Sequence, residues 1–289
     1  MSIIESNMES SAADAEDFEV TVIEPSRGFL SLNLKEVWVY RELLYFLIWR
    51  DVKVRYKQTF IGAAWAIIQP VTTMVIFTLL FKRIASMPSD GLPYPIFAYS
   101  ALLPWNLFAG ALTRSSTSLV AQARLITKVY FPRLIVPLSA TVSGCVDFAI
   151  AFVILIGMMM WYGIVPGWAV LTLPLFILLA MSAAFSISLW LSALNVRYRD
   201  VGHALPFVVQ LWLFASPVAY PTSVVPEKWQ LVYSLNPMAG VIEGFRWALL
   251  DKAHPDFGVL TVSALMTALL LFGGLIYFKR MERTFADVV

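Results

Sequence analysis

The sequence predicts an all-α membrane protein with six transmembrane helices. A helix needs about 20 mostly apolar residues to cross a bilayer, and six such stretches lie between residues 61 and 278. The composition agrees, because 59% of the 289 residues are hydrophobic and only 14% are charged, against about 25% charged residues in soluble domains. The predicted crossings are Ile61–Phe81, Tyr94–Leu112, Leu134–Tyr162, Trp168–Leu194, Val201–Val225 and Val259–Phe278.

The segment before the first crossing divides into a tail and a helix. Residues 1–30 are rich in acidic side chains and lack the apolar core of a signal peptide, so we expect a disordered tail followed by a membrane domain over residues 31–289. Leu34–Gln58 mixes apolar and charged residues, and its uncharged core, Leu43–Trp49, is too short to span. We therefore expect an amphipathic helix lying in the membrane surface, or alternatively a plain juxtamembrane anchor. The cations of this helix that we single out are Arg50, Lys53, Arg55 and Lys57.

Lys and Arg are distributed unevenly between the two sides of the predicted bundle. With the N-terminus placed in the cytoplasm, the cytoplasmic segments hold 16 of these residues and the outer segments hold 5. Cytoplasmic loops of membrane proteins carry such an excess, so both termini are expected in the cytoplasm. The formal net charge of +2 is too small to suggest nucleic-acid binding.

The loop between the second and third crossings combines positive charge with aromatic residues. It contains Arg124, Lys128 and Arg133, with Tyr130 and Phe131 just before the last of them. This mixture suits docking to another protein, although an ordinary positive-inside loop has the same composition.

Asp147 is an ionisable residue in the middle of the third crossing. A carboxylate there costs at least a few kcal/mol unless it faces a partner or water. It therefore indicates either a functional site or a neutral group that is hydrogen-bonded within the bundle. His203 lies near the cytoplasmic start of the fifth crossing, where an interfacial position is the simpler interpretation.

Two short helices are predicted between the fifth and sixth crossings. Pro226 begins one, and Asn236 with Pro237 marks the start of the other, because Asn caps a helix and Pro fits its first position. The second helix is too short to cross and carries Glu243 and Arg246, which are spaced to pair. We expect it to dip into the membrane from outside and return, which makes the region a candidate gate.

Sequence motifs for catalysis are missing. The chain has no G-x-x-x-x-G-K-[ST], G-x-S-x-G or H-E-x-x-H pattern. With one cysteine and two histidines, no metal site or resident cofactor is expected. For a membrane enzyme, the best acid or base groups would be His203 with Asp200, or Glu243 alone.

Aromatic residues near the outer ends of the predicted crossings suit contact with the C–H faces of sugars, although interfacial aromatics are the common alternative. They include Tyr99, Trp105, Phe108, Trp212 and Tyr220.

Three segments resemble a known family. They read SLVAQARLITKVYFPRLIVPLSATVSGCVDF (Ser118–Phe148), LNVRYRDV (Leu194–Val201) and SPVAYPTSVVPEKWQLVYSLNPMAGVIEGFRWALL (Ser216–Leu250). Together they are similar to the permease subunit of bacterial ABC exporters for O-antigen, capsule or teichoic acid, within the type-2 ABC exporter superfamily. The resemblance covers about residues 34–285.

The resemblance implies partners and roles. Two copies of the chain would pair in the inner membrane and bind two copies of a separate ATPase, which would hold ATP and Mg. Leu34–Gln58 would be the interface helix, and Pro226–Leu235 and Pro237–Leu249 would be outer gate helices beside an aromatic-lined channel. The substrate would be a glycan on undecaprenyl pyrophosphate. An exporter of a lipid or drug, or less readily a membrane enzyme acting on lipid-linked sugars, are the alternatives. The coupling loop to the ATPase would hold Arg124, Leu125, Lys128, Tyr130, Phe131 and Arg133.

Overall fold

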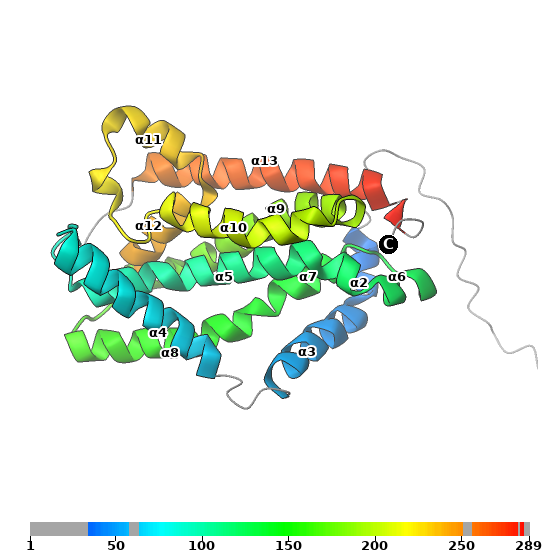
Figure 1. The fold of residues 1–289 in the computed structure, drawn as a ribbon, viewed down its shortest axis with the longest axis horizontal. Helices are drawn as coiled ribbons and strands as arrows, with labels where there is room; N and C mark the ends of the chain where they lie inside the picture. The colour runs from blue at the N-terminus through cyan, green and yellow to red at the C-terminus, as the bar shows by residue number, and fades with distance from the viewer. Residues whose placement is uncertain (1–33, 58–63, 251–255, 283, 286–289) are drawn as a thin grey trace, which may run out of the picture. The chain divides into compact units, whose positions relative to one another are not determined.

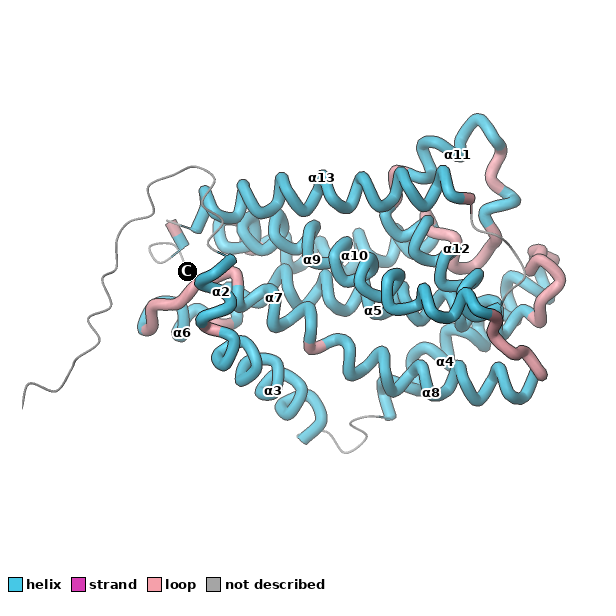
Figure 2. The backbone as a smooth tube through the Cα atoms, turned by 180° about the vertical axis from the view of Figure 1, so that it is seen from behind, coloured by secondary structure: helices cyan, strands magenta, loops and turns pink. Residues whose placement is uncertain are grey.

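The computed structural model describes residues 34–57, 64–250, 256–282 and 284–285. The predicted tail, residues 1–30, lies outside them. All regular structure in the described part is helical (Figures 1 and 2). The α-helices are α2 (Leu34–Val39), α3 (Arg41–Lys57), α4 (Trp65–Phe77), α5 (Tyr94–Ala121), α6 (Ala123–Lys128), α7 (Ile135–Val142), α8 (Gly144–Tyr162), α9 (Leu173–Arg197), α10 (Asp200–Phe214), α11 (Glu227–Ser234), α12 (Pro237–Leu250) and α13 (Phe257–Glu282).

Five helical stretches in the described part are long and apolar enough to cross a membrane, and α10 is a shorter apolar helix. The chain is therefore a helical membrane protein. The five stretches are Trp65–Ile84, Tyr94–Ala121, Ile135–Trp161, Trp168–Arg197 and Phe257–Glu282. The first ends in a π-helical segment (Thr78–Ile84), and the fourth begins with a 3₁₀ turn (Trp168–Thr172).

Three stretches differ from the sequence prediction by more than a few residues or by a break. The second runs on from Leu112 to Ala121, which brings Arg114 into a helix. The third is divided at Ser143 into α7 and α8. The fifth ends at Phe214, and the chain then turns through Ser216, whose N–H donates to Leu213 O at 3.3 Å. At 1.5 Å per residue, α10 is about 22 Å long, shorter than a bilayer core of about 30 Å.

Helix α5 forms the centre of the fold. It contacts α4, α7, α8, α9, α10 and α12, and most of its side chains are buried. Polar groups fasten it: Ser115 Oγ lies 2.8 Å from both Pro137 O of α7 and Ser188 Oγ of α9. Buried serines of this kind let helices approach closely and hydrogen-bond in an apolar environment.

The two ends of α5 meet different elements. Near Tyr94, α5 contacts α12; we call this the α12 end. Near Ala121, it leads into α6; we call this the α6 end. Helix α3 packs on α7 (Figure 1), where its buried Leu47 joins an apolar cluster with Ile135 and Val136. The two ends carry different polar groups, which are considered in turn below.

Candidate functional site

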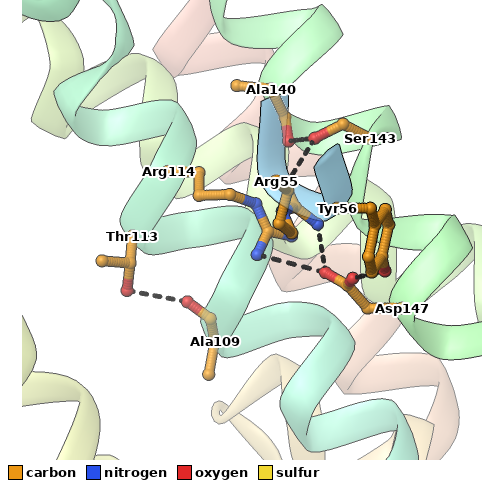
Figure 3. Close-up of polar contacts among 8 residues, drawn as sticks. All are labelled: Arg55, Tyr56, Ala109, Thr113, Arg114, Ala140, Ser143 and Asp147. Atoms are coloured by element: carbon orange, nitrogen blue, oxygen red, sulfur yellow. Dashed lines mark hydrogen bonds and ion pairs between the residues drawn. The ribbon is translucent and has the colours of Figure 1, made fainter. Parts of the chain in front are cut away.

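Asp147 is the centre of a polar cluster that joins three helices (Figure 3). Arg55 Nη1 donates to Asp147 Oδ2, and the Tyr56 hydroxyl donates to the other carboxylate oxygen, so both contacts tie the end of α3 to α8. Arg55 also donates to Ser143 Oγ at 3.3 Å. Burial and the bond to Asp147 raise the pKa of Tyr56 to about 12, so the phenol is a hydrogen-bond donor at neutral pH. The carboxylate predicted inside a crossing therefore faces charged partners.

Arg114 is a second cation at this carboxylate, and sequence reasoning did not select it. Its Nη1 lies 3.6 Å from Asp147 Oδ2. Two glycines make room for it: a Cβ on Gly110 would lie 2.9 Å from Arg114 Nη1, and one on Gly144 would overlap the same guanidinium. Arg114 follows Gly110 by one helical turn, a spacing that gives a sequence signal for a side chain lying back along its own helix.

The cluster borders a cavity of about 570 Å³ between α3, α4, α5, α8 and α10. Its polar lining includes Gln69 and Asn106, and its charged lining residues are Arg55, Arg114 and Asp147. These three groups sum to one positive charge. Such a cavity favours anionic ligands, because guanidinium groups form strong hydrogen bonds with carboxylates and phosphates.

The coupling residues divide into an exposed and an enclosed set. Arg124, Lys128 and Tyr130 are exposed on and just after α6. Phe131 is buried in the apolar cluster that contains Leu47, and Leu125 packs against that cluster.

Arg133 has partners within the chain. Its backbone N–H donates to Glu282 Oε1 at 3.1 Å, and its guanidinium donates to the carbonyl of the same residue. It also lies 6.0 Å from the ring of Phe285. Arg133 therefore fastens the end of α13 to the loop after α6.

The cations of α3 also divide. Lys53 and Lys57 are exposed. Arg50 bonds its neighbour Asp51 at 2.8 Å, whereas Arg55 belongs to the Asp147 cluster. Exposed aromatic side chains accompany them on α3, as expected of a helix at a membrane interface; these are Tyr45, Phe46 and Trp49.

Arg246 is held by neutral oxygens at the α12 end. It does not form the predicted pair with Glu243. It donates to Val218 O at 3.0 Å and to Phe97 O at 3.4 Å, and it lies 3.6 Å from the ring centroid of Phe97. Tyr94 adds a bond to Ala219 O at 2.7 Å. One arginine thus binds α12, α5 and the turn after α10 together.

The predicted start of α12 is confirmed. Pro237 is the first helical residue, and Asn236 Oδ1 accepts from the N–H of Met238 at 3.0 Å. The same oxygen accepts from Trp212 Nε1 at 3.0 Å, which links the cap to α10. The Tyr220 hydroxyl donates to Phe214 O at 3.0 Å in the intervening turn.

The selected aromatics of α5 belong to the interior of the chain. Tyr99, Trp105 and Phe108 are buried, and Tyr99 donates to Ala151 O of α8 at 3.0 Å. Phe108 meets the partly exposed Trp212 edge-to-face, with 5.2 Å between ring centroids. Within the described residues, no group of three or more His, Cys, Asp or Glu side chains is placed to hold a metal ion.

Known proteins similar to this chain include O-antigen export permeases and a polysialic acid transport protein. The O-antigen export system permease protein RfbA of Myxococcus xanthus is 29% identical over 258 residues, which are 89% of this chain and 98% of that protein. The RfbA protein of Klebsiella pneumoniae is 26% identical, with 86% and 95% covered. The polysialic acid transport protein KpsM of Escherichia coli is 22% identical, with 82% and 92% covered. The family model for ABC-2 type transporters matches residues 42–250, and the chain belongs to that family.

Proposed function

We propose that the chain is the transmembrane subunit of an ATP-driven exporter that moves a lipid-linked polysaccharide across the cytoplasmic membrane. One observation carries the proposal: the likeness to O-antigen and polysialic acid export proteins extends over 92% to 98% of their lengths. The polysaccharide would be of the O-antigen, capsule or teichoic acid type. As a member of the ABC-2 family, the chain works with a separate ATPase subunit.

The proposed topology has six crossings over residues 31–289 and both termini in the cytoplasm. The five long stretches supply five crossings, and α10 with the turn after it supplies the sixth. Helices α11 and α12 would then enter the membrane from the outer side as gate helices. The α6 end would face the cytoplasm, which agrees with the excess of Lys and Arg there.

The proposed complex contains two copies of this chain and two ATPase subunits, with ATP and Mg bound to the ATPases. The α6 end offers the contact, because Arg124, Lys128 and Tyr130 are exposed there. Helix α3 lies beside it as the interface helix. Motion of the ATPases would enter the membrane part through these two helices.

The proposed substrate is a glycan on undecaprenyl pyrophosphate. It needs a protein path because each unpaired polar group costs several kcal/mol in hydrocarbon. The cations of α3 and the positively charged cavity support recognition of the pyrophosphate at the inner leaflet. In a pair of chains, the partly exposed Trp212 and Tyr220 and the gate helices near the α12 end would border the glycan path.

Copurification followed by reconstitution tests the proposal. The chain is expressed with the ATPase encoded beside it, and ATP hydrolysis is measured in liposomes with and without lipid-linked glycan. We expect a stable complex whose ATPase rate rises with the glycan. Stimulation by a lipid or drug instead would favour the related exporter. Turnover of lipid-linked sugar by the isolated chain would replace the proposal with a membrane enzyme.

A further inference from the structure

We propose that Asp147 is a latch that holds α3 against α8 and that a phosphate-class anion in the adjoining cavity displaces it. The inference deepens the proposed function, since a phosphate-class anion is what a lipid-linked glycan carries. It assigns to Asp147 a regulatory role: its carboxylate binds the arginines for which the anion would compete.

The contacts show why Asp147 acts as a latch. Its two oxygens accept from Arg55 and Tyr56, which are adjacent residues in the last turn of α3. Arg55 also donates at 3.3 Å to Ser143 Oγ, at the break between α7 and α8. Releasing the carboxylate therefore removes both bonds from this end of α3 to Asp147.

The charges show why an anion would compete. Two guanidinium groups share one carboxylate, which leaves the cavity with one uncompensated positive charge. The Arg114 Nε is buried and has no hydrogen-bond partner in the described part of the chain. A buried cation with an open donor favours a further anionic oxygen. A phosphate group provides more oxygens than a carboxylate and can bond both guanidinium groups at once.

The cavity has the size and lining for such a ligand. At about 570 Å³ it lies within the range of small-molecule sites. Gln69 of α4 and Asn106 of α5 line it alongside the two arginines, and their side-chain amides are further hydrogen-bond donors. A phosphate can therefore enter beside Asp147 before it takes over the arginines.

Displacement would change α3, which is the proposed contact to the ATPase. When the anion takes Arg55 and the carboxylate turns away from α3, the Tyr56 hydroxyl loses its charged acceptor. Helix α3 is then held by the contact near Ser143 and by apolar packing around Leu47. Binding of an anion in the cavity thus changes how α3 is held, and α3 lies beside the α6 end.

The test measures hydrogen exchange of α3 in the full chain, in phosphatidylcholine nanodiscs without ATPase or glycan. We compare the wild type with Asp147→Asn and with the control Glu42→Gln, which removes an exposed carboxylate from the first turn of α3. Asp147→Asn should raise exchange near residues 52–57 by about tenfold, because a bond between charged groups is lost. Glu42→Gln should leave these residues as in the wild type.

Inorganic pyrophosphate supplies the second arm, at an ionic strength matched with NaCl. It should raise exchange in the wild type and not in Arg114→Gln, and it should bind Asp147→Asn about tenfold more tightly than the wild type. Discs containing phosphatidylglycerol test bulk lipid headgroups: release of α3 there without pyrophosphate supports the latch and identifies a headgroup as the anion.

Two results would overturn the latch: unchanged exchange in Asp147→Asn, or equal responses to pyrophosphate in the wild type and Arg114→Gln. If Asp147→Asn does not insert, Arg55→Gln removes the same bond from the α3 side and carries the same expectation. Because the assay contains neither glycan nor ATPase, a failure of polysaccharide export would leave its outcome unaffected.

Discussion

The guanidinium groups of Arg55 and Arg246 both bond groups within the helical bundle, but their partners differ in kind. Arg55 bonds a carboxylate at the edge of a cavity, where a second cation lies 3.6 Å from the same oxygen atom. Arg246 bonds two backbone carbonyls and covers an aromatic ring. A carboxylate can be exchanged for another anion, whereas backbone carbonyls remain in place as long as the fold persists.

This difference between the partners of Arg55 and Arg246 indicates which end of the molecule should move. At the α12 end, Arg246, Tyr94 and Asn236 connect α5, α10, α12 and the turn between them by bonds that involve no acidic side chain. This part should move as one body. Helix α3, which lies beside the α6 end, bonds α8 through the carboxylate of Asp147 and bonds the serine just before α8. A signal from the ATPase or the substrate should therefore act first at the α6 end.

Replacing Arg246 should have the largest effect. Arg246→Met removes two charge-assisted bonds and leaves the carbonyls of Phe97 and Val218 without this donor, so we expect a loss of about 3 kcal/mol in unfolding free energy. Thermal unfolding in detergent, followed by size-exclusion chromatography, measures it. Lys228→Met is the matched control, because Lys228 is an exposed cation on α11. An unfolding midpoint equal to that of the control would contradict the fastening role.

A glycine of α12 tests the rigidity of the same end without changing charge. A Cβ on Gly244 would overlap the ring of Phe176, which is 2% exposed. Gly244→Ala should therefore destabilise the protein by about 2 kcal/mol.

Gly157 provides the control, because a Cβ there meets nothing within 4 Å. Gly157→Ala should raise the unfolding midpoint slightly, since alanine favours a helix by up to about 1 kcal/mol over glycine. Equal effects of the two substitutions would show that the α12 end adapts and is not one rigid body.

Substitution of the exposed cations of α6 tests whether the α6 end contacts the ATPase. Arg124→Glu combined with Lys128→Glu reverses the charge offered to the ATPase, so we expect glycan-stimulated ATP hydrolysis to fall about tenfold while insertion is unchanged. Arg133 is left intact, because its bonds to Glu282 make it a structural residue. Lys228→Glu at the other end serves as the control. Full stimulation in the double variant would remove α6 from the contact.

The sequence predicted those features that depend on local chemistry. Asn236 and Pro237 specify a helix start within two residues of chain, and the structure places the start there. The long apolar stretches were predicted because bilayer thickness sets their length. The early end of α10 was not, since apolar residues such as Val218 and Ala219 continue past Phe214, whereas the α-helix covers the first 14 residues of Val201–Val225.

The Asp147 cluster shows what could not be predicted. Asp147 was marked by its position in an apolar stretch, but Arg55 lies 92 residues away, and only the packing of α3 brings it there. Arg114 was assigned to a loop, because hydropathy falls where α5 still continues as a helix. The same limit applies to Glu243 and Arg246: their spacing allows a pair, yet the surrounding carbonyls compete successfully for the guanidinium.

Replacing Tyr56 should have the smallest effect on stability, and this effect should be the most specific to the Asp147 cluster. Tyr56→Phe removes one hydrogen bond to Asp147 and should cost about 1 kcal/mol. Burial raises the pKa of Tyr56 to about 12, above its ordinary value of 10.0, so the folded protein favours the neutral phenol. The stabilisation is therefore complete below pH 10 and is lost as the pH rises toward 12.

The difference in unfolding midpoint between the wild type and Tyr56→Phe should thus be constant from pH 6 to 9 and shrink above about pH 10. Tyr45→Phe is the control, because Tyr45 is 70% exposed on the same helix, and its midpoint should equal that of the wild type from pH 6 to 9. Equal midpoints of the wild type and Tyr56→Phe from pH 6 to 9 would mean that the phenol donates nothing to Asp147. The attachment of α3 would then rest on Arg55 and Ser143, and an anion would need to displace a single ion pair to release it.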